Sequence, residues 1–598
     1  MVLLLPLIAF VAAMALAQSY TPQGLVPSAP SVVWCLVAGG AGAWGLCRLW
    51  ARAVMWLERS KAGTWSRRGE AVVYLSAVGA TATVACGGLK AWCTAAGMPQ
   101  SLQAIVMSAV FFAVLAMGWW GALPLERAAG RVGVSGAGYV WKRVRFVLPV
   151  ALPWVVGEGV VEALEAWGMQ EWLDSGWAQV AGAGGFILIM GLGLPAVVRW
   201  WWGGQKVEGV VRKLADQVLE RAGTGVRDVV YWEVLEGWMV SAGVVGLVER
   251  FSYLMLSPSL VHMMNPPELQ AVVAHEAGHL RGRHMWAYLV LLVGLMAGLW
   301  GLGPVVEAGI WAGVWAAASA GWELKGGGGW DVAIAMGMVG VLAGYVRYGM
   351  GPFIRAMERQ ADLFALRLLG DSQPLIGALE KIAVASGLRR DNPSWHHYSI
   401  AERVDFLLEA QAHPGLIRAH THKLRRAWAI YLIVVGIVVG LGQGIEALGV
   451  VARARAAAIT QLARHQLLLN PSPRARMALG VALYEQGRYK QALTELEKAL
   501  SQAPSDPEIL NALAWVLATA KDPAVRNPRR AVALARQAVA MAPVAHIWDT
   551  LAEALMAAGQ PARAVAAAQA AMRAPGAKAR MDYYRRQLKR FRAALEHK

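Results

Sequence analysis

Long apolar stretches separated by short polar segments dominate the chain up to about residue 450. An α-helix needs about 20 apolar residues to cross the hydrocarbon core of a bilayer. The run from Met1 to Ala17 is also apolar and ends in Ala15-Leu16-Ala17, so it is either a signal peptide or an additional first span. The pattern predicts a mainly α, multi-span transmembrane protein. Eight further stretches have roughly the crossing length: 31–50, 70–93, 102–124, 146–165, 179–202, 286–306, 332–350 and 428–450.

The composition agrees with a protein that lies largely in lipid. Hydrophobic residues make up 57% of the 598 residues, charged residues make up 16%, and the mean hydropathy is +0.41, outside the range of soluble globular proteins. The formal net charge of +18 would suit a nucleic-acid partner. The basic residues, however, cluster beside apolar stretches and in the C-terminal region rather than in an aromatic-interleaved patch. We therefore expect a lipid bilayer as partner and no nucleic acid.

The distribution of positive charge predicts how the chain is oriented in the membrane. Lysine and arginine in short loops stay on the cytoplasmic side, and they are concentrated at 48–68 and 127–145. The loop at 166–178 has Glu171 and Asp174 but no lysine or arginine, which is typical of an outward-facing loop. Counting crossings from these loops places 203–285 in the cytoplasm. We expect a multi-pass protein of the cell (inner) membrane with this segment on its cytoplasmic side.

The segment from residue 203 onward changes character. Charged residues appear within a few helical turns, and β-like runs follow at 229–232 and 253–256. This pattern predicts a folded domain over 203–427 that is interrupted by the two membrane segments 286–306 and 332–350.

A helix that carries a metal-binding pattern is predicted inside this domain. Asn265 is placed to cap it, prolines follow at the first helical positions, and Glu268 stands three residues after the cap. The helix contains the run His275-Glu276-Ala277-Gly278-His279, in which the two histidines are four residues apart and project from one face. Both imidazoles can therefore reach one Zn²⁺, while Glu276 can take a proton from a metal-bound water.

The HExxH run could also have arisen by chance. With 12 histidines in 598 residues, we estimate the probability of a chance HExxH at roughly 1%, so the signal is fairly specific. The neighbouring His262 and His284 are interpreted as surface or interfacial residues rather than ligands.

A third zinc ligand has to come from elsewhere, because a catalytic zinc takes three protein ligands and keeps one open position. The best candidate is the helical segment 355–365, where Glu358 and Asp362 are four residues apart and share a face with apolar residues around them. An ordinary solvated charged face would be the favoured explanation of this segment if it stood alone. The HExxH run upstream favours the metal site.

These motifs resemble peptidase family M48, the group that includes the bacterial heat-shock membrane protease and the CAAX prenyl protease. The resemblance covers about 205–410 and includes Ser399-Ile400-Ala401-Glu402-Arg403. Ser241-Ala242 stands where many relatives have an Asn-Ala pair after the first strand, a departure that concerns the substrate-side strand and not the metal site. The resemblance implies that Glu358 is the third zinc ligand, that Asp362 orients a ligand histidine, and that Arg355 is a buried partner of the acidic cluster. It also implies that His397 stabilises the oxyanion. The adjacent His396 is the alternative for this role, and an ordinary surface histidine would explain either residue.

The C-terminal region after the span at 428–450 is alanine-rich and repetitive. Small and aromatic residues recur at the spacing of tetratricopeptide repeats, in three copies. The alternative is a generic alanine-rich helical bundle. Repeats of this kind form surfaces that bind peptides or proteins, and they carry no catalysis. The residues on which the repeat pattern rests are Leu479, Gly480, Gly487, Tyr489, Ala492, Ala499, Pro504, Ala531, Ala538, Pro543, Leu551, Ala552, Gly559, Ala564 and Ala571.

Together the patterns predict a zinc-dependent membrane endopeptidase that cleaves membrane or misfolded proteins and recruits substrate or a protein partner through its repeats. One alternative is a processing protease for a lipidated or otherwise defined substrate. Another is an inactive membrane scaffold that acts through its repeats, although the intact Glu276 argues against it. The predicted order is a transmembrane region at 1–202, the peptidase domain at 203–427, a span at 428–450 and repeats at 451–598. A single crossing at 428–450 would place the repeats across the membrane from the zinc site; a surface helix or a hairpin would not.

Overall fold

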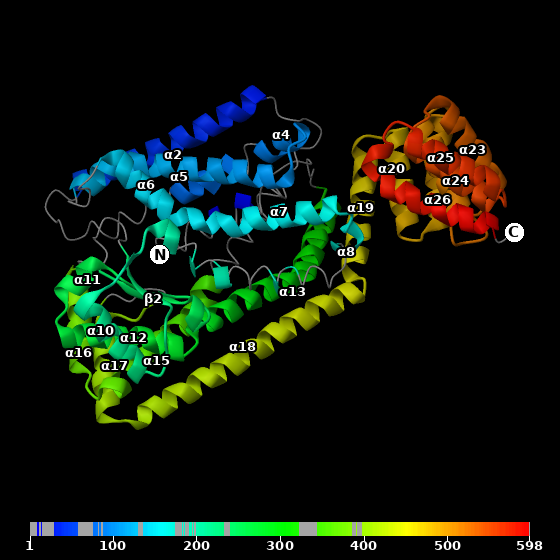
Figure 1. Ribbon diagram of the computed structural model, residues 1–598. Helices are drawn as coiled ribbons and strands as arrows, with labels where there is room; N and C mark the ends of the chain where they lie inside the picture. Colours follow the sequence, from blue (N-terminus) through cyan, green and yellow to red (C-terminus); the bar gives the residue numbers. More distant parts are fainter. Residues whose placement is uncertain are drawn as a thin grey trace. The chain divides into compact units, whose positions relative to one another are not determined.

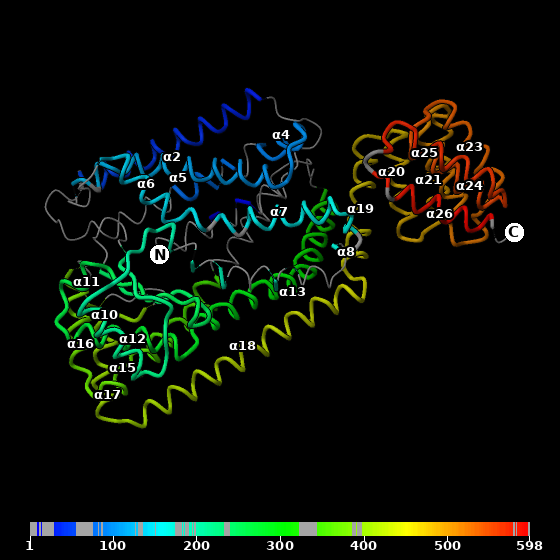
Figure 2. Tube along the Cα trace, in the orientation of Figure 1, coloured from blue at the N-terminus to red at the C-terminus, as the bar shows by residue number. Residues whose placement is uncertain are grey.

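The computed structural model describes most of the chain, which divides into two compact units. The first unit comprises Met1–Leu295 and Gly327–Tyr431, and the second comprises Met296–Gly326 and Leu432–Lys598. Figure 1 gives the element labels, and Figure 2 traces the same chain along its Cα atoms. The described residues are 9–10, 13–14, 29–57, 76–81, 83–84, 88–128, 135–173, 182, 184–185, 191–193, 195–196, 199–232, 240–321, 344–385, 390–391 and 397–596.

Four helices in the described part of the chain are long and apolar enough to cross a membrane. They confirm four of the predicted stretches, those at 31–50, 102–124, 286–306 and 428–450. The chain is therefore mainly α with several candidate spans, as its hydrophobic pattern predicts. The four helices are α2 (Ala29–Leu57), α5 (Gln100–Ala128), α13 (His284–Ser319) and α18 (Gly415–Ala447).

The predicted stretch at 146–165 is helical but interrupted. It contains the 3-10 turn η2 (Leu148–Ala151) and the 15-residue helix α7 (Leu152–Ala166), which is shorter than a crossing requires. Pro149 and Pro153 lie at these two helix starts, and proline cannot donate the backbone hydrogen bond that would continue a preceding helix. Each of the other predicted stretches, at 1–17, 70–93, 179–202 and 332–350, lies partly outside the described residues.

The N-terminal helices of the first unit pack around α2 and α5. A Cβ added at Gly121 of α5 would overlap the carbonyl oxygen of Trp44 on α2, so a glycine is needed where the two backbones cross. Phe111, Leu115 and Trp119 of α5 are fully buried in the same cluster. The shorter helices of this region are α4 (Leu89–Ala95), α6 (Gly136–Val147) and α8 (Gln170–Leu173).

A four-stranded sheet opens the predicted peptidase domain. Its order is β1-β2-β4-β3, with β2 and β4 parallel and both outer pairs antiparallel. The two β-like runs predicted at 229–232 and 253–256 coincide with β2 and β4. The strands are β1 (Gln205–Lys206), β2 (Asp228–Tyr231), β3 (Ala242–Val245) and β4 (Tyr253–Leu256), with α10 (Gly209–Arg221) and the 3-10 turn η4 (Glu249–Phe251) between them.

The predicted capped helix is present as α12 (Pro266–Arg281), which follows the short helix α11 (Pro258–Met263). The side chain of Asn265 accepts from the N–H of Glu268 at 2.9 Å, and Glu268 Oε2 accepts from the N–H of Asn265 at 2.9 Å. These two bonds satisfy backbone donors that a helix start leaves unpaired, and they fix where α12 begins.

Helix α12 packs against α15 (Gly351–Leu369), and these two neighbouring helices are drawn in green in Figure 1. A Cβ added at Gly278 would lie 2.9 Å from the Cα of Ala361, so the contact is made backbone to backbone. Two further helices complete the domain core around this pair, α16 (Gln373–Ala385) and α17 (Ile400–Ala412).

Tyrosine hydroxyls connect the helices next to α12 and α15. The π-helical turn η5 (Tyr345–Met350) runs directly into α15, and the Tyr345 hydroxyl lies 2.6 Å from both the carbonyl oxygen of Leu291 on α13 and the Tyr431 hydroxyl on α18. These bonds connect the segment that follows α12 with the segment that precedes α15.

The second unit contains the C-terminal repeats, whose helices pair in sequence order from yellow to red in Figure 2. Small buried side chains such as Ala492, Ala499 and Ala538 lie at the helix contacts, which is typical of the repeat pattern seen in the sequence. The helices are α19 (Val450–Leu469), α20 (Pro473–Glu485), α21 (Tyr489–Gln502), α22 (Pro507–Thr519), α23 (Pro528–Met541), α24 (Ala545–Ala557), α25 (Pro561–Arg573), the 3-10 turn η6 (Ala577–Arg580) and α26 (Met581–Glu596).

Candidate metal centre

The two neighbouring helices α12 and α15 bring three potential metal ligands together. One ligand atom from each of His275, His279 and Glu358 lies within 4.8 Å of the other two. The Nε2 atoms of the two histidines are 3.2 Å apart, and the Glu358 oxygens lie 3.7 Å from His275 Nε2 and 3.5 Å from His279 Nε2. Ligands bound about 2 Å from a tetrahedral zinc are roughly 3.3 Å from one another. The three side chains therefore fit a Zn²⁺ ion in both chemistry and spacing.

Glu276 is buried beside this donor set, on the side that faces the sheet. The backbone N–H of Val244 on β3 donates to its carboxylate. Burial raises the pKa of Glu276 to about 7, and the charge of Glu358 adds to the rise. A carboxylate with a pKa near neutrality is suited to take up and release a proton.

Asp362 holds the first histidine. Its Oδ1 lies 2.9 Å from His275 Nδ1, which leaves the Nε2 of that ring facing the other ligands. The carboxylate also accepts two hydrogen bonds from the Arg403 guanidinium, 2.6 Å to Oδ1 and 2.9 Å to Oδ2. Although burial opposes the charged form, Arg403 and His275 lower the pKa of Asp362 to about 2, so it stays ionised.

Arg403 is a site residue to which the sequence reasoning gave no role. It lies on α17, whose start is fixed by a capping box between Ser399 and Glu402. The signal available in the sequence was that capping box, because it places the arginine on the first turns of a helix in a segment shared with the resembling family. Its partner, 41 residues earlier in the chain, could not be read from spacing.

The protonation of the ligands suits a metal site. Burial lowers the pKa of His279 to about 3, so its imidazole is neutral near pH 7, as a zinc ligand must be. Burial opposes ionisation of Glu358, but contacts with His397, His279 and His275 hold the pKa of that carboxyl well below its usual range. The carboxylate is therefore charged and available as a ligand.

The structure places His397 next to the ligand set, with its Nδ1 3.1 Å from Glu358 Oε2. Arg355 lies over the ring of the following residue, Tyr398, at 5.8 Å, and Arg359 lies over the same ring at 3.6 Å. The guanidinium that contacts Asp362 belongs to Arg403. The roles predicted for His397 in oxyanion stabilisation and for Arg355 beside the acidic cluster remain predictions, and His396 lies outside the described residues.

The two histidines that the sequence analysis interpreted as surface or interfacial residues differ in their burial. His262 is exposed, with its Nδ1 2.7 Å from the carbonyl oxygen of Pro258, as expected for a surface residue. His284 is only 1% exposed, so its interpretation as a surface or interfacial residue is wrong. Its ring is buried because the chain turns sharply after α12. This turn brings His284 Nδ1 to 2.9 Å from His279 Nδ1.

Comparisons with known proteins give a family match for the region that contains these residues. Residues 205–431 match peptidase family M48, and residues 473–516 match a tetratricopeptide repeat family. Among solved structures, the crystal structure of Ste24p from S. mikatae is 15% identical, covers 64% of this chain and 99% of its own, and has a TM-score of 0.37. No curated protein matches the chain.

Proposed function

Because residues 205–431 match metallopeptidase family M48 in a chain with four candidate membrane spans, we propose that this protein is a zinc-dependent membrane endopeptidase. The observation that carries the proposal is the convergence of His275, His279 and Glu358 beside a buried Glu276. Two imidazoles and one carboxylate are a common ligand set of catalytic zinc, and the remaining coordination position is left for water or substrate.

Each side chain of the site has a distinct part in peptide-bond hydrolysis. A bound Zn²⁺ would polarise the scissile carbonyl and lower the pKa of a water molecule. Glu276 takes the proton of the attacking water and then delivers a proton to the leaving amine. Asp362 keeps the Nδ1 proton of His275 and so directs its Nε2 toward the metal, while Arg403 keeps Asp362 ionised.

The sheet offers a way to hold an extended polypeptide. Strand β3 stands at the end of the described sheet, and its Val244 N–H points to the Glu276 carboxylate, so this edge faces the catalytic groups. An extended peptide can add to a free strand edge through backbone hydrogen bonds, with little demand on its sequence. We therefore favour membrane or misfolded proteins as substrates over a single defined peptide.

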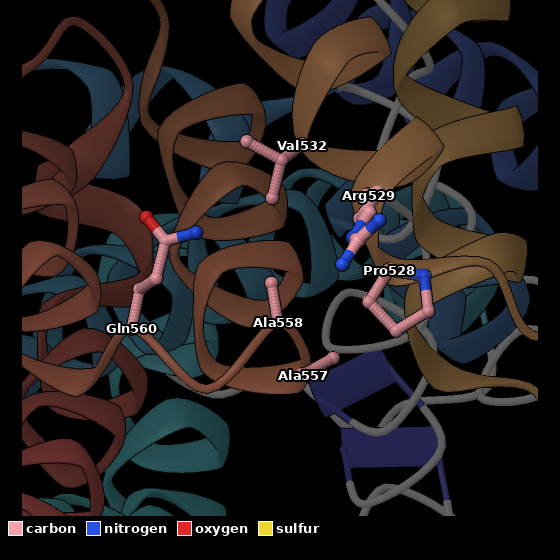
Figure 3. A pocket seen from close by; sticks show the side chains of 6 residues that line it. All are labelled: Pro528, Arg529, Val532, Ala557, Ala558 and Gln560. Carbon is pink, nitrogen blue, oxygen red and sulfur yellow. The ribbon is translucent and has the colours of Figure 1, made fainter.

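The repeats are proposed to recruit substrate or a protein partner. A hollow of about 540 Å³ lies between helix α23, which supplies Pro528, Arg529 and Val532, and the end of α24 with the loop before α25. Figure 3 shows that Arg529 and Gln560 give this hollow polar groups beside its small apolar residues. A surface with this mixture suits a peptide segment, and the match of residues 473–516 to a tetratricopeptide repeat family supports the general role.

Metal analysis and activity of three variants test the proposal. Purified wild-type protein should contain about one zinc per chain. His275→Ala and Glu358→Ala should lose the metal, whereas Glu276→Gln should retain it and lose activity by about 10²- to 10⁴-fold. His262→Ala, which changes an exposed histidine, is the matched control and should keep both.

Substrates can be found by comparing membrane proteomes of cells that express the wild type or the Glu276→Gln variant. Proteins that accumulate with the variant are the candidate substrates. Cleavage by Glu276→Gln at the wild-type rate would show that this carboxylate is not the base, and an inactive wild type would favour the scaffold alternative.

A further inference from the structure

The turn between α12 and α13 has an unusual backbone conformation. In the part of the chain that the structure describes, Arg283 is the one residue other than glycine with a positive φ, 51°. The left-handed region is sparsely populated by residues with a side chain, so it persists only where the surroundings enforce it. The next residue is His284, which is 1% exposed. This turn therefore drives a histidine ring into the interior immediately after the metal-bearing helix.

Glycine is also required at the preceding position. A Cβ at Gly282 would overlap His284 Nε2 and would lie 3.0 Å from the carbonyl oxygen of Gly278. The absence of a side chain leaves room for the imidazole. Two neighbouring backbone features, at Gly282 and Arg283, thus serve the placement of one ring.

The buried ring bridges a metal ligand and the opposite helix. His284 Nδ1 lies 2.9 Å from His279 Nδ1, and His284 Nε2 lies 3.0 Å from Gln360 Oε1 on α15. The two rings meet edge to face, with their centroids 4.8 Å apart. Gln360 stands two residues after Glu358, so the bridge joins the helix that bears the histidines to the helix that bears the carboxylate.

One arrangement of protons satisfies every contact in the bridge. His279 Nε2 faces His275 Nε2 and Glu358, so it must be unprotonated to bind a metal. The proton of His279 then resides on Nδ1, and this N–H donates to His284 Nδ1. The proton of His284 consequently resides on Nε2, and that N–H donates to the amide oxygen of Gln360.

We propose that His284 is a positioning residue that, anchored by Gln360, holds His279 in the tautomer and orientation required of a metal ligand. The inference rests on the proposed function, since it presumes that His279 binds zinc. The bridge does for His279 what Asp362 does for His275, but with a neutral acceptor in place of a carboxylate. Partners of this kind typically change metal affinity 10- to 100-fold when they are removed.

The test measures zinc affinity of the full-length chain in detergent by competition with a chromophoric chelator. His284→Phe keeps an aromatic ring and removes the acceptor, and should weaken zinc binding 10- to 100-fold. His284→Asn supplies an amide oxygen near the position of Nδ1 and should recover most of the affinity. Gln360→Leu, which leaves the His284 N–H without its acceptor, should weaken binding by a smaller factor. His262→Phe is the matched control and should bind like the wild type.

Two further readouts separate positioning from general stability. The thermal unfolding midpoint of the zinc-free variants should stay close to that of zinc-free wild type. The visible spectrum of the Co²⁺-loaded protein should change in His284→Phe and be restored in His284→Asn, because it reports the geometry of the ligands.

The outcomes separate this inference from the proposed function. A wild type that does not bind zinc would overturn both. If the wild type binds zinc and His284→Phe binds it equally well, only the inference is wrong. Equal losses in His284→Phe and His284→Asn would also overturn it, because the ring would then matter for packing rather than as an acceptor. Should His284→Phe fail to fold, Gln360→Leu decides, and wild-type affinity in that variant contradicts the bridge.

Discussion

The peptidase domain and the repeats each bury an aspartate, and the two carboxyls behave in opposite ways. Asp362 is fully buried against Arg403 and His275, and its pKa falls to about 2. Asp549 on α24 is 6% exposed and accepts one hydrogen bond, 3.0 Å from the Tyr583 hydroxyl. Burial raises the pKa of Asp549 to about 6. Burial opposes the charged form of both aspartates, and the geometry of the hydrogen-bond and ion-pair partners decides whether each one stays ionised.

The largest difference in the free energy of unfolding should appear when an ion-paired arginine is replaced in each region. Arg403→Leu leaves the buried Asp362 charge without its main partner and should lower the free energy of unfolding by about 3–5 kcal/mol. In the repeats, Arg530 pairs with Glu497 at the surface, and Arg530→Leu should cost about 0–1 kcal/mol. Denaturant titration of the two variants measures both values. Equal losses would contradict the contrast between a buried and an exposed pair.

The next effect is a dependence of repeat stability on pH. Asp549 binds its proton more tightly in the folded chain than at its ordinary pKa of 3.8, so between pH 3.8 and about 6 the folded state holds more protons than the unfolded one. Stability therefore falls as pH rises through this window, by at most about 3 kcal/mol. Glu553 strengthens the shift, whereas Arg590 and Arg580 weaken it.

Asp549→Asn should abolish this slope, because the amide does not titrate. Thermal unfolding of the full chain, followed through the repeat transition from pH 4 to pH 7, makes the comparison. The matched variant Asp506→Asn changes an aspartate at a helix cap whose pKa is lowered, and it should leave the downward slope in place. If the stability of Asp549→Asn still falls as pH rises, the pH dependence belongs to another group.

Helix contacts at glycine provide a smaller but cleaner comparison. A Cβ at Gly278 would lie 2.9 Å from the Cα of Ala361, and one at Gly480 would lie 2.7 Å from the Cγ of Leu496. The first contact is with backbone, which cannot move aside, whereas the second is with the side chain of Leu496, which is itself fully buried. Gly278→Ala should cost about 1–3 kcal/mol and weaken zinc binding. Gly480→Ala should cost less, about 0–2 kcal/mol, since a gain of about 1 kcal/mol in helix propensity offsets part of the crowding against the buried Leu496.

The smallest effect concerns helix caps. Ser399 caps α17 by accepting from the N–H of Glu402 at 3.2 Å, and Ser472 caps α20 by accepting from the N–H of Ala475 at 3.2 Å. Alanine at either position should lower stability by about 1 kcal/mol. Only Ser399→Ala should also weaken zinc binding, because α17 carries Arg403. Unchanged zinc affinity in Ser399→Ala would show that the cap does not position the guanidinium.

Local signals in the sequence were sufficient for much of the fold. The cap at Asn265 and the four-residue spacing of His275 and His279 depend only on neighbours along one helix, and both predictions about α12 are confirmed. The repeats follow from short-range recurrence in the same way. Proline at 149 and 153 is a local signal too, and it coincides with the interruption of the helical stretch at 146–165.

The missed features depend on contacts between distant segments. Arg403 donates to Asp362, which lies 41 residues earlier in the chain. His284 is buried because the preceding residue, Arg283, has a left-handed backbone conformation, which the side chain of His284 does not predict. The order of the strands likewise follows from a crossover between β2 and β4, with β3 placed outside. Spacing along one element cannot reveal such pairings, since they are decided by which elements pack together.

The separation of the site residues along the chain has a consequence during synthesis. The ribosome makes the histidine pair of α12 first, then the stretch that contains α13 and leads to Glu358, and Arg403 last. At 5–20 residues per second, the stretch from His279 to Arg403 takes roughly 10 seconds to emerge. Through that interval the nascent chain holds an incomplete donor set beside its own unfolded segments. A peptidase whose ligands lay on one helix would have no such delay before it could cut the chain that is still being made.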